Sequence, residues 1–334
     1  MAGNRTIPRL WRDAVAQNTG TAYLVEEDGG WREVTWAEAA ERVESLANGL
    51  LARGVRKGDA FAILARNTLE WALFDFALAH VGAVGAAVYA NSSPQDVRYV
   101  LEHSDAVGVL CEDDDQRAKV EEGRATLPRL TQVLTFADLP ALEEEGRVYR
   151  DASPGALEEA VAAIDEEDLF TFIYTSGTTG PPKGCMIRHR NYYAMVTTVD
   201  DLPDHSAPGD VMLLYLPLAH NFGRLMHLAG PYVGYTIAFL PDPLRTASFV
   251  CAMALVTPDG DEIVRHGVVD GHLLRAPRGE NGFGYDPLFV ADGHSVTTGE
   301  LEAAAKDAIS HRGQAVRAIV PVLIAELRRW ASDA

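Results

Sequence analysis

Hydrophobic positions in the first 140 residues follow two patterns that alternate along the chain. Short runs of consecutive apolar residues, bounded by glycine and polar residues, are typical of strands buried on both faces. Between these runs, apolar residues recur every three or four positions behind Ser or Thr, which favour helix starts. The expected strands are 60–65, 85–89, 107–111 and 132–136, and the expected helices begin at Thr35, Thr68 and Ser93. This alternation predicts an α/β fold, a parallel sheet with helices on both faces.

The helix that begins at Thr35 has the clearest boundary signals. Thr35-Trp-Ala-Glu38 is a capping box, and Gly54 supplies a C-terminal stop. Its apolar face is expected to run through Ala39, Val43, Leu46, Ala47 and Leu50. The preceding residues, 22–33, predict a hairpin that turns at Asp28-Gly29-Gly30.

The pattern changes beyond Arg245. Two runs, 248–256 and 262–269, flank a turn at Pro258-Asp-Gly260 and predict an antiparallel hairpin. A last helix is expected over 314–330, with a kink at Pro321. Its apolar stripe is predicted to pack as core and consists of Val316, Ile319, Val320, Leu323, Ile324 and Leu327.

The charge of the chain also changes near residue 245. Of the net charge of −19, the first 244 residues carry −16, with 20 basic and 36 acidic residues. So acidic a chain disfavours nucleic acid or an anionic membrane as a general partner, although nucleotide binding needs only a local positive site. A length of 334 residues suggests about two domains. We therefore place the expected boundary between residues 244 and 245.

Cysteine usage and hydropathy predict a cytoplasmic protein. Cys111, Cys185 and Cys251 lack metal-ligand spacing, which predicts reduced, buried, structural thiols and no metal site. The first five residues lack the apolar run of a secretory signal. The most apolar long stretch, 211–240, is interrupted by proline, histidine and arginine and predicts no transmembrane helix.

The most informative chemistry lies in Tyr174-Thr-Ser-Gly-Thr-Thr-Gly-Pro-Pro-Lys-Gly184, which follows an expected strand. Backbone N–H groups, hydroxyls and one ammonium on a glycine-rich bend can hold phosphate groups. It is not a Walker A loop, because two prolines intervene and glycine follows the lysine. The alternative is a solvated turn without a ligand. The expected phosphate-binding residues are Thr175, Ser176, Gly177, Thr178, Thr179, Gly180 and Lys183.

This loop resembles the signature loop of the AMP-forming adenylating enzymes, the superfamily that includes the acyl-CoA synthetases. The segment 30–38, Gly58-Asp59 and Asn67 also fit the first half of an acyl-CoA synthetase. The resemblance implies ATP and Mg²⁺ as cofactors, with CoA as a further candidate, and a fatty acid or other acyl substrate. It fades near residue 241, before the later segments of that family.

A second segment, 214–224, resembles a family segment that lines the acyl pocket and approaches the nucleotide. On that resemblance His220 and Lys183 are the candidate catalytic residues. The alternative for His220 is a core or loop histidine.

Residues 245–334 resemble the C-terminal half of the Ham1-type pyrophosphatases, which hydrolyse non-canonical purine triphosphates. The resemblance rests on Asn281-Gly-Phe-Gly-Tyr-Asp-Pro287 and Ser310-His-Arg312. Aromatic faces at Phe283 and Tyr285 can stack on a purine. The polar groups expected to read a base edge are Asp286, Lys306, Ser310, His311 and Arg312, and the spacing of Lys306 and Ser310 predicts one shared helix face.

The expected organisation is therefore a partial AMP-binding domain, 1–244, followed by a partial Ham1-like α/β lobe, 245–334, with an antiparallel hairpin. Each part lacks segments of its family's machinery, and the Ham1 sheet is expected to lose strands and expose edges. Three hypotheses follow: an AMP-forming acyl-CoA ligase-like protein, a dITP/XTP pyrophosphatase-like protein, or an inactive fusion of two truncated enzymes.

Overall fold

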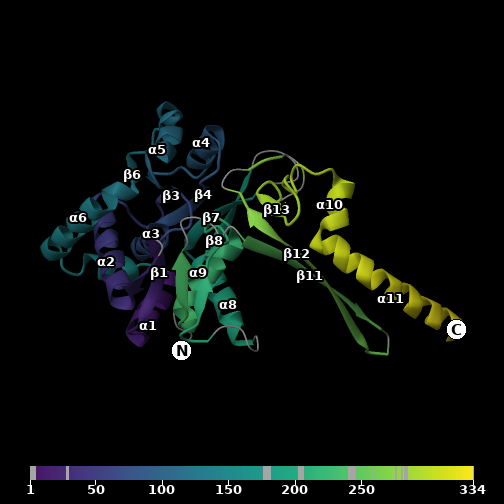
Figure 1. Ribbon diagram of the computed structural model, residues 1–334. Coiled ribbons are helices and arrows are strands. Elements are labelled where there is room, and N and C mark those ends of the chain that lie inside the picture. The colour runs from purple at the N-terminus through teal and green to yellow at the C-terminus, as the bar shows by residue number, and fades with distance from the viewer. Residues whose placement is uncertain are drawn as a thin grey trace. The chain divides into compact units, whose positions relative to one another are not determined.

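The computed structural model describes residues 5–27, 30–175, 182–201, 207–239, 246–257, 259–274, 277–279, 281 and 285–333. The chain divides into two compact units, Met1–Pro241 and Asp242–Ala334 (Figure 1). The boundary expected between residues 244 and 245 falls in 240–245, outside the described residues. Among the described helices, none has the length and apolar composition needed to cross a membrane.

A six-stranded sheet forms the centre of the first unit, in the order β6-β5-β3-β4-β7-β8. Its strands are β3 (Ala60–Ala65), β4 (Val84–Tyr89), β5 (Gly108–Cys111), β6 (Gln132–Thr135), β7 (Leu169–Thr175) and β8 (Lys183–Arg188). Neighbours from β6 to β7 pair in parallel, whereas β8 runs antiparallel to β7. The connection between β7 and β8 is too short for a parallel crossover, so it closes a hairpin.

A second sheet of this unit has the order β2-β1-β10-β9. Its strands are β1 (Thr21–Glu27), β2 (Gly30–Thr35), β9 (Val211–Leu213) and β10 (Thr236–Phe239). The expected hairpin is present as the antiparallel pair β1–β2, and its turn residues Asp28 and Gly29 lie outside the described residues. β10 pairs in parallel with β1, which joins the start of the chain to residues near the end of the unit.

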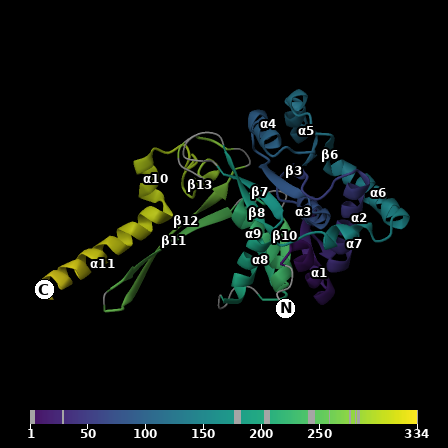
Figure 2. The same cartoon turned by 180° about the vertical axis from the view of Figure 1, so that it is seen from behind.

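Nine helices accompany these two sheets in the described part of the unit. They are α1 (Ile7–Gln17), α2 (Trp36–Ala52), α3 (Leu69–Val81), α4 (Pro94–His103), α5 (Asp114–Glu121), α6 (Leu139–Ala152), α7 (Ala156–Ala162), α8 (His189–Thr197) and α9 (Asn221–Val233). Figure 2 shows α2, α6 and α7 side by side. The Thr35 side chain accepts a hydrogen bond from the backbone of Glu38 at 3.1 Å, as the capping box predicts.

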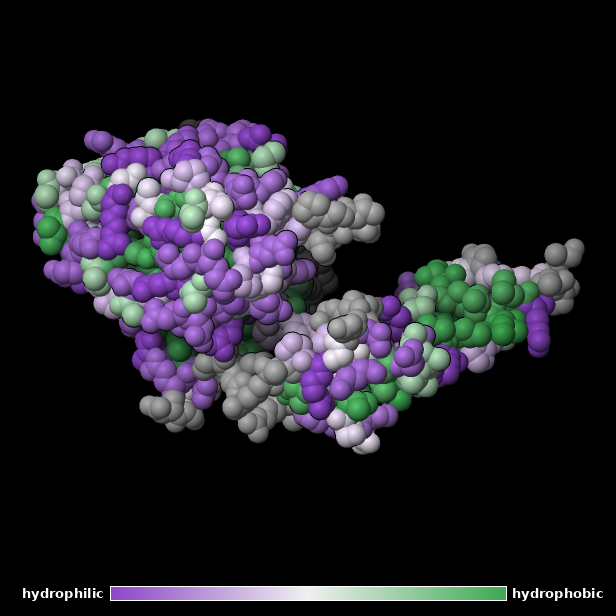
Figure 3. Space-filling view, turned by 90° about the horizontal axis from the view of Figure 1, so that it is seen from above, coloured by the Kyte–Doolittle hydropathy of each residue, from purple (hydrophilic) through white to green (hydrophobic). Residues whose placement is uncertain are grey.

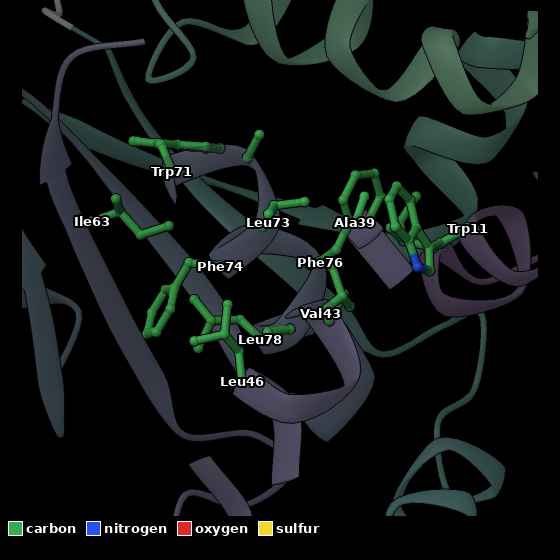
Figure 4. Close-up of a cluster of buried hydrophobic side chains, with 14 of the residues drawn as sticks. Trp11, Ala39, Val43, Leu46, Ile63, Trp71, Leu73, Phe74, Phe76 and Leu78 are labelled. Carbon is green, nitrogen blue, oxygen red and sulfur yellow. The ribbon is translucent and has the colours of Figure 1, made fainter. Parts of the chain in front are cut away.

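Helix α3 is buried on all sides, because it packs against α1, α2 and strands β3 and β4. Trp71, Phe74 and Phe76 are completely buried, and the ring of Phe76 lies 4.2 Å from that of Trp11 on α1 (Figure 4). The predicted apolar face of α2 faces the same core, and Val43 and Leu46 are among its buried residues. Helix α3 therefore lies in the hydrophobic core that these helices share.

The Asn191 side chain, in the first turn of α8, accepts a hydrogen bond from the backbone of Arg188. One local expectation was wrong. Cys185 is not buried, because it lies on the edge strand β8, whereas Cys111 on β5 is buried and Cys251 partly so. Burial raises the pKa of the Cys111 thiol to about 12.

The second unit is built on a three-stranded antiparallel sheet in the order β11-β12-β13. Its elements are β11 (Thr246–Val256), β12 (Glu262–Leu273), β13 (Phe289–Ala291), α10 (Ala303–Ile309) and α11 (His311–Asp333). The predicted hairpin is present as β11–β12, and α11 packs on both strands. A Cβ on Gly267 of β12 would lie 1.9 Å from the backbone oxygen of His311, so only glycine allows this approach.

The apolar stripe of α11 does not pack as core, contrary to the prediction. Ala315 and Ile319 are buried, but Leu327 is 50% exposed. The other exposed members of the stripe are Val316, Val320 and Ile324. Figure 3 shows hydrophobic surface (green) gathered on the second unit. The described sheet has only three strands, and it covers one narrow face of the helix. Helix α11 continues through Pro321, and the kink expected there stays a prediction.

Replacing Gly146 by Ala is expected to destabilise the first unit by about 3 kcal/mol. A Cβ at this position of α6 would lie 1.8 Å from the backbone oxygen of Ser45 on α2. Alanine favours an isolated helix over glycine, so propensity alone predicts the opposite sign. Urea unfolding measures the change, with Val148→Ala on the exposed face of α6 as a control of unchanged stability. A stabilised G146A protein would contradict this helix contact.

Acid is expected to destabilise the first unit between pH 6.5 and about 4, by roughly 2 kcal/mol for each of three buried histidines. Burial lowers the pKa of His80 and His189 to about 4 and that of His227 to about 3. The unfolded chain takes up protons below pH 6.5 while these groups stay neutral in the fold. The stability that these neutral histidines contribute is therefore fully present above pH 6.5 and is lost as the pH decreases toward 4. Unfolding at pH 7 and 4.5 tests this, because His80→Gln should flatten the dependence and the exposed His294→Gln should not.

Candidate functional site

The β7–β8 hairpin carries the two described ends of the glycine-rich loop. Its register pairs Thr175 with Lys183 and Tyr174 with Gly184. Of the expected phosphate-binding residues, Ser176, Gly177, Thr178, Thr179 and Gly180 lie outside the described residues. Lys183 is exposed at the start of β8. The hairpin thus places a threonine and a lysine opposite each other where the loop leaves the sheet.

Two side chains of α4 hold the flanks of this loop. The Tyr99 hydroxyl donates a hydrogen bond to the Pro182 carbonyl at 2.9 Å, and His103 Nδ1 lies 3.0 Å from the Tyr174 hydroxyl. The rings of Tyr99 and His103 are stacked, with centroids 5.4 Å apart. Burial raises the pKa of Tyr174 to about 12, so its hydroxyl keeps its proton at neutral pH. Sequence reasoning missed both α4 residues, whose spacing of four positions was their only signal.

The segment that carries His220 is shaped by Asn67, at the end of β3. The Asn67 amide donates hydrogen bonds to the carbonyls of Leu214 (3.2 Å) and Leu216 (2.7 Å), and its oxygen accepts one from the Leu218 backbone (2.7 Å). One side chain thereby satisfies three backbone groups of an irregular stretch. Asn67 therefore has a structural role, because it holds the backbone path before His220.

His220 is exposed and stands at the N-cap of α9. Its Nδ1 accepts a hydrogen bond from the Phe222 backbone at 3.2 Å. Cap residues with a side-chain acceptor stabilise helix starts, so this nitrogen is occupied by the fold. Within the described ranges no hydrogen bond or ion pair joins His220 to Lys183, the other candidate catalytic residue.

One turn further along α9, Arg224 is fully buried and forms an ion pair with Asp75 of α3. The guanidinium also donates a hydrogen bond to the Thr171 hydroxyl of β7 at 2.5 Å. Burial pushes the pKa of Asp75 upward, and the positive charge of Arg224 opposes that shift. The sequence placed Arg224 at the end of a motif but gave no signal of its burial.

In the second unit, an ion pair joins two of the predicted purine-binding residues. Lys306 Nζ lies 2.6 Å from Asp286 Oδ2, and the Thr298 hydroxyl donates to Asp286 Oδ1 at 2.9 Å. The carboxylate is only 11% exposed and the ammonium 19%. Phe283 lies outside the described residues, and Tyr285 is half-buried. The structure therefore brings together Asp286 and Lys306 among the expected residues.

The helix face expected to join Lys306 and Ser310 does not exist, because α10 ends at Ile309. Ser310 is extended, with φ −65° and ψ 150°, and its hydroxyl accepts a hydrogen bond from the Gly313 backbone at 2.9 Å. His311 then begins α11 and stacks on Phe249 of β11, with ring centroids 5.0 Å apart.

Arg312 is exposed on the first turn of α11. The sequence predicted Phe249 only as part of a strand and gave no sign that it contacts His311.

Two family models match the chain. The model of the AMP-binding enzyme family matches residues 11–257, and the model of the Ham1 family matches residues 236–322. The matches overlap in the region that separates the two compact units.

Curated relatives fall into the same two groups. The long-chain-fatty-acid–CoA ligase FadD15 of Mycobacterium bovis is 37% identical over 218 residues, 64% of this chain and 36% of the ligase. The dITP/XTP pyrophosphatase of Cutibacterium acnes is 54% identical over 209 residues, 62% of this chain and 88% of that protein. A second pyrophosphatase, from Frankia alni, is 60% identical over 84 residues, 25% of this chain and 42% of that protein. The chain spans about a third of the length of the ligases that it matches.

Solved structures share the fold of the first part of this chain. The N-terminal domain of FACL13 from Mycobacterium tuberculosis superposes with a TM-score of 0.61 at 21% identity, over 71% of this chain and 57% of that one. ATP-bound MatB from Rhodopseudomonas palustris superposes with a TM-score of 0.56 at 24% identity, over 72% of this chain and 46% of that one. At this level of identity the likeness establishes the fold of the matched part.

Replacing Lys306 by Met is expected to destabilise the second unit by about 2 kcal/mol, because it removes a charge-assisted partner of a largely buried carboxylate. Hydrogen exchange of β13 and α10 in the full chain measures the local loss. Asp307→Asn, on the exposed side of the same helix, is the matched control. Equal protection in K306M and the unsubstituted chain would show that the pair contributes nothing.

Proposed function

We propose that the first unit binds ATP as an acyl-CoA ligase-like, AMP-forming protein, because this chain belongs to the AMP-binding enzyme family over residues 11–257. Over residues 236–322 the chain belongs to the Ham1 family. The observation that carries the proposal is the β7–β8 hairpin, which sets Thr175 opposite Lys183 and has both flanks of its loop bonded to α4. Such a loop can present hydroxyls, backbone N–H groups and one ammonium to a triphosphate. The ligand set of this site is Thr175, Ser176, Gly177, Thr178, Thr179, Gly180 and Lys183.

The proposed reaction joins a carboxylate to AMP. A carboxylate oxygen attacks the α-phosphorus of ATP, a carboxyl–phosphate bond forms, and the bond to the β-phosphate breaks to release pyrophosphate. Lys183 neutralises charge on the phosphate oxygens, and His220 faces the acyl substrate. The protein's part is positioning and charge neutralisation.

Mg²⁺, as the companion of ATP, supplies further positive charge at the phosphates. Among the described residues no group of three His, Cys, Asp or Glu side chains could hold a metal ion. CoA, the acyl acceptor of the ligases, belongs to a second step that we propose only if adenylation occurs.

The second unit supports a second candidate, hydrolysis of a non-canonical purine triphosphate such as dITP or XTP. The specific observation is the largely buried Asp286–Lys306 pair, in which Asp286 is adjacent to Tyr285 in sequence. Water would attack the α-phosphorus and release a nucleoside monophosphate and pyrophosphate. Purine contacts are assigned to Phe283, Tyr285, Asp286, Lys306, Ser310, His311 and Arg312. The chain as an inactive fusion of two incomplete enzymes is the third outcome.

ATP affinity is expected to fall about tenfold in Lys183→Ala, because one ammonium contact to a phosphate is lost. Titration of the full chain with ATP measures it, and Lys57→Ala changes the same charge on a lysine that pairs with Asp168 instead. An ATP affinity that is unaltered in K183A would overturn the assignment.

Pyrophosphate release then separates the two reactions. Release that requires ATP together with a fatty acid supports the ligase, and release from dITP or XTP alone supports the pyrophosphatase. The absence of pyrophosphate release with both sets of substrates supports the inactive fusion.

A further inference from the structure

The Arg224 guanidinium is a fully buried charge in the first unit. It and Asp75 are both 0% exposed. Its Nε donates to Asp75 Oδ2 at 3.1 Å, a second nitrogen donates to Asp75 Oδ1, and the third donates to Thr171 Oγ1 at 2.5 Å. The rings of Trp71 and Phe170 flank it at 5.2 and 4.7 Å. Each of the three guanidinium nitrogens therefore has a protein acceptor.

Thr171 connects the Arg224 guanidinium to strand β7 of the six-stranded sheet. Its hydroxyl donates its single proton to the Gly85 carbonyl of β4 at 2.6 Å, so toward Arg224 it can only accept. A Cβ on Gly85 would lie 3.0 Å from Arg224 and 3.3 Å from Asp75, so the absence of a side chain there leaves room for the pair. Thr171 stands four residues before Thr175, on the strand that enters the glycine-rich loop.

On the other side, Arg224 belongs to the first turn of α9. Its backbone N–H donates to the His220 carbonyl at 3.0 Å. The guanidinium thus connects the turn that His220 caps to the strand that ends at Thr175. These two stretches are far apart in sequence and belong to the two motifs of the proposed ATP and acyl sites.

We infer that Arg224, held by Asp75 and Thr171, is a positioning residue that fixes the His220 end of α9 relative to the Thr175 end of β7. A buried ion pair adds little net stability over apolar packing, but its directed hydrogen bonds allow one arrangement where apolar side chains allow several. Three donors with three acceptors set both the depth and the rotation of α9. The functional part of this inference rests on the proposed ATP site, and the structural part does not.

Two substitutions of Thr171 separate hydrogen bonding from packing. Thr171→Val keeps the shape of the side chain and removes the hydroxyl, whereas Thr171→Ser keeps the hydroxyl and removes a methyl group. Both leave the Asp75–Arg224 pair in place, so both are expected to fold. Val43→Ala, a core substitution on α2 without polar contacts to the site, is the control for general destabilisation.

Hydrogen exchange measures, in the absence of nucleotide, how firmly β7 and the first turn of α9 are held. In T171V, exchange is expected to rise about tenfold in both β7 and the first turn of α9. T171S is expected to exchange like the unsubstituted chain. A rise confined to β7, or an equal rise at both places in V43A, would overturn the inference.

ATP titration of the same proteins measures the effect of each substitution on ATP affinity. The expected result is about tenfold weaker binding in T171V and unchanged binding in T171S and V43A. Weakening in T171S with normal binding in T171V would show that packing matters, and would overturn the role of the hydrogen bond. If the unsubstituted chain binds no ATP, the proposed function fails, and hydrogen exchange alone decides whether Arg224 positions α9.

Discussion

A charge removed from water must meet an opposite charge and fill its hydrogen bonds, and the Asp75–Arg224 pair satisfies this condition in the core of the first unit. Asp75 comes from α3 and Arg224 from α9, and Thr171 of β7 completes the set. The sheet, its central covering helix and a helix from late in the unit can therefore close only in one way. The rings of Trp71 and Phe170 flank the Arg224 guanidinium, and Gly85 leaves space for the pair because it has no side chain.

The candidate site is built by contacts of the same kind, in which a side chain from one element fixes the backbone of another. Asn67 bonds the stretch before His220, and Tyr99 bonds the carbonyl of Pro182. Irregular segments bury backbone groups that no ladder satisfies, so they depend on such side chains for a defined path. The loop and the His220 segment carry the chemistry, while α3, α4 and β3 decide where their ends lie.

The second unit illustrates how much a hydrophobic stripe depends on its partner. Ile319 is buried against the β11–β12 hairpin, while Leu327, two turns later on α11, is half exposed. The matched part of the Ham1 family here amounts to 87 residues, and its sheet has three strands in the described residues. A narrow sheet cannot cover a long helix. The Asp286–Lys306 pair is still formed, between the turn before β13 and helix α10.

The sequence by itself determined the local elements and the identity of the motifs. The capping box at Thr35, the alternation of strands and helices and the β11–β12 hairpin follow from spacing over a few residues. The two family resemblances rest on short motifs that match known families. Tertiary structure alone decided the antiparallel course of β8, the exposure of Cys185 and of the α11 stripe, and the break at Ser310 that separates Lys306 from His311. It also decided the burial of Arg224. Periodicity records which face of an element is apolar, but whether that face is covered, and by which charge or strand, depends on residues far away in the chain.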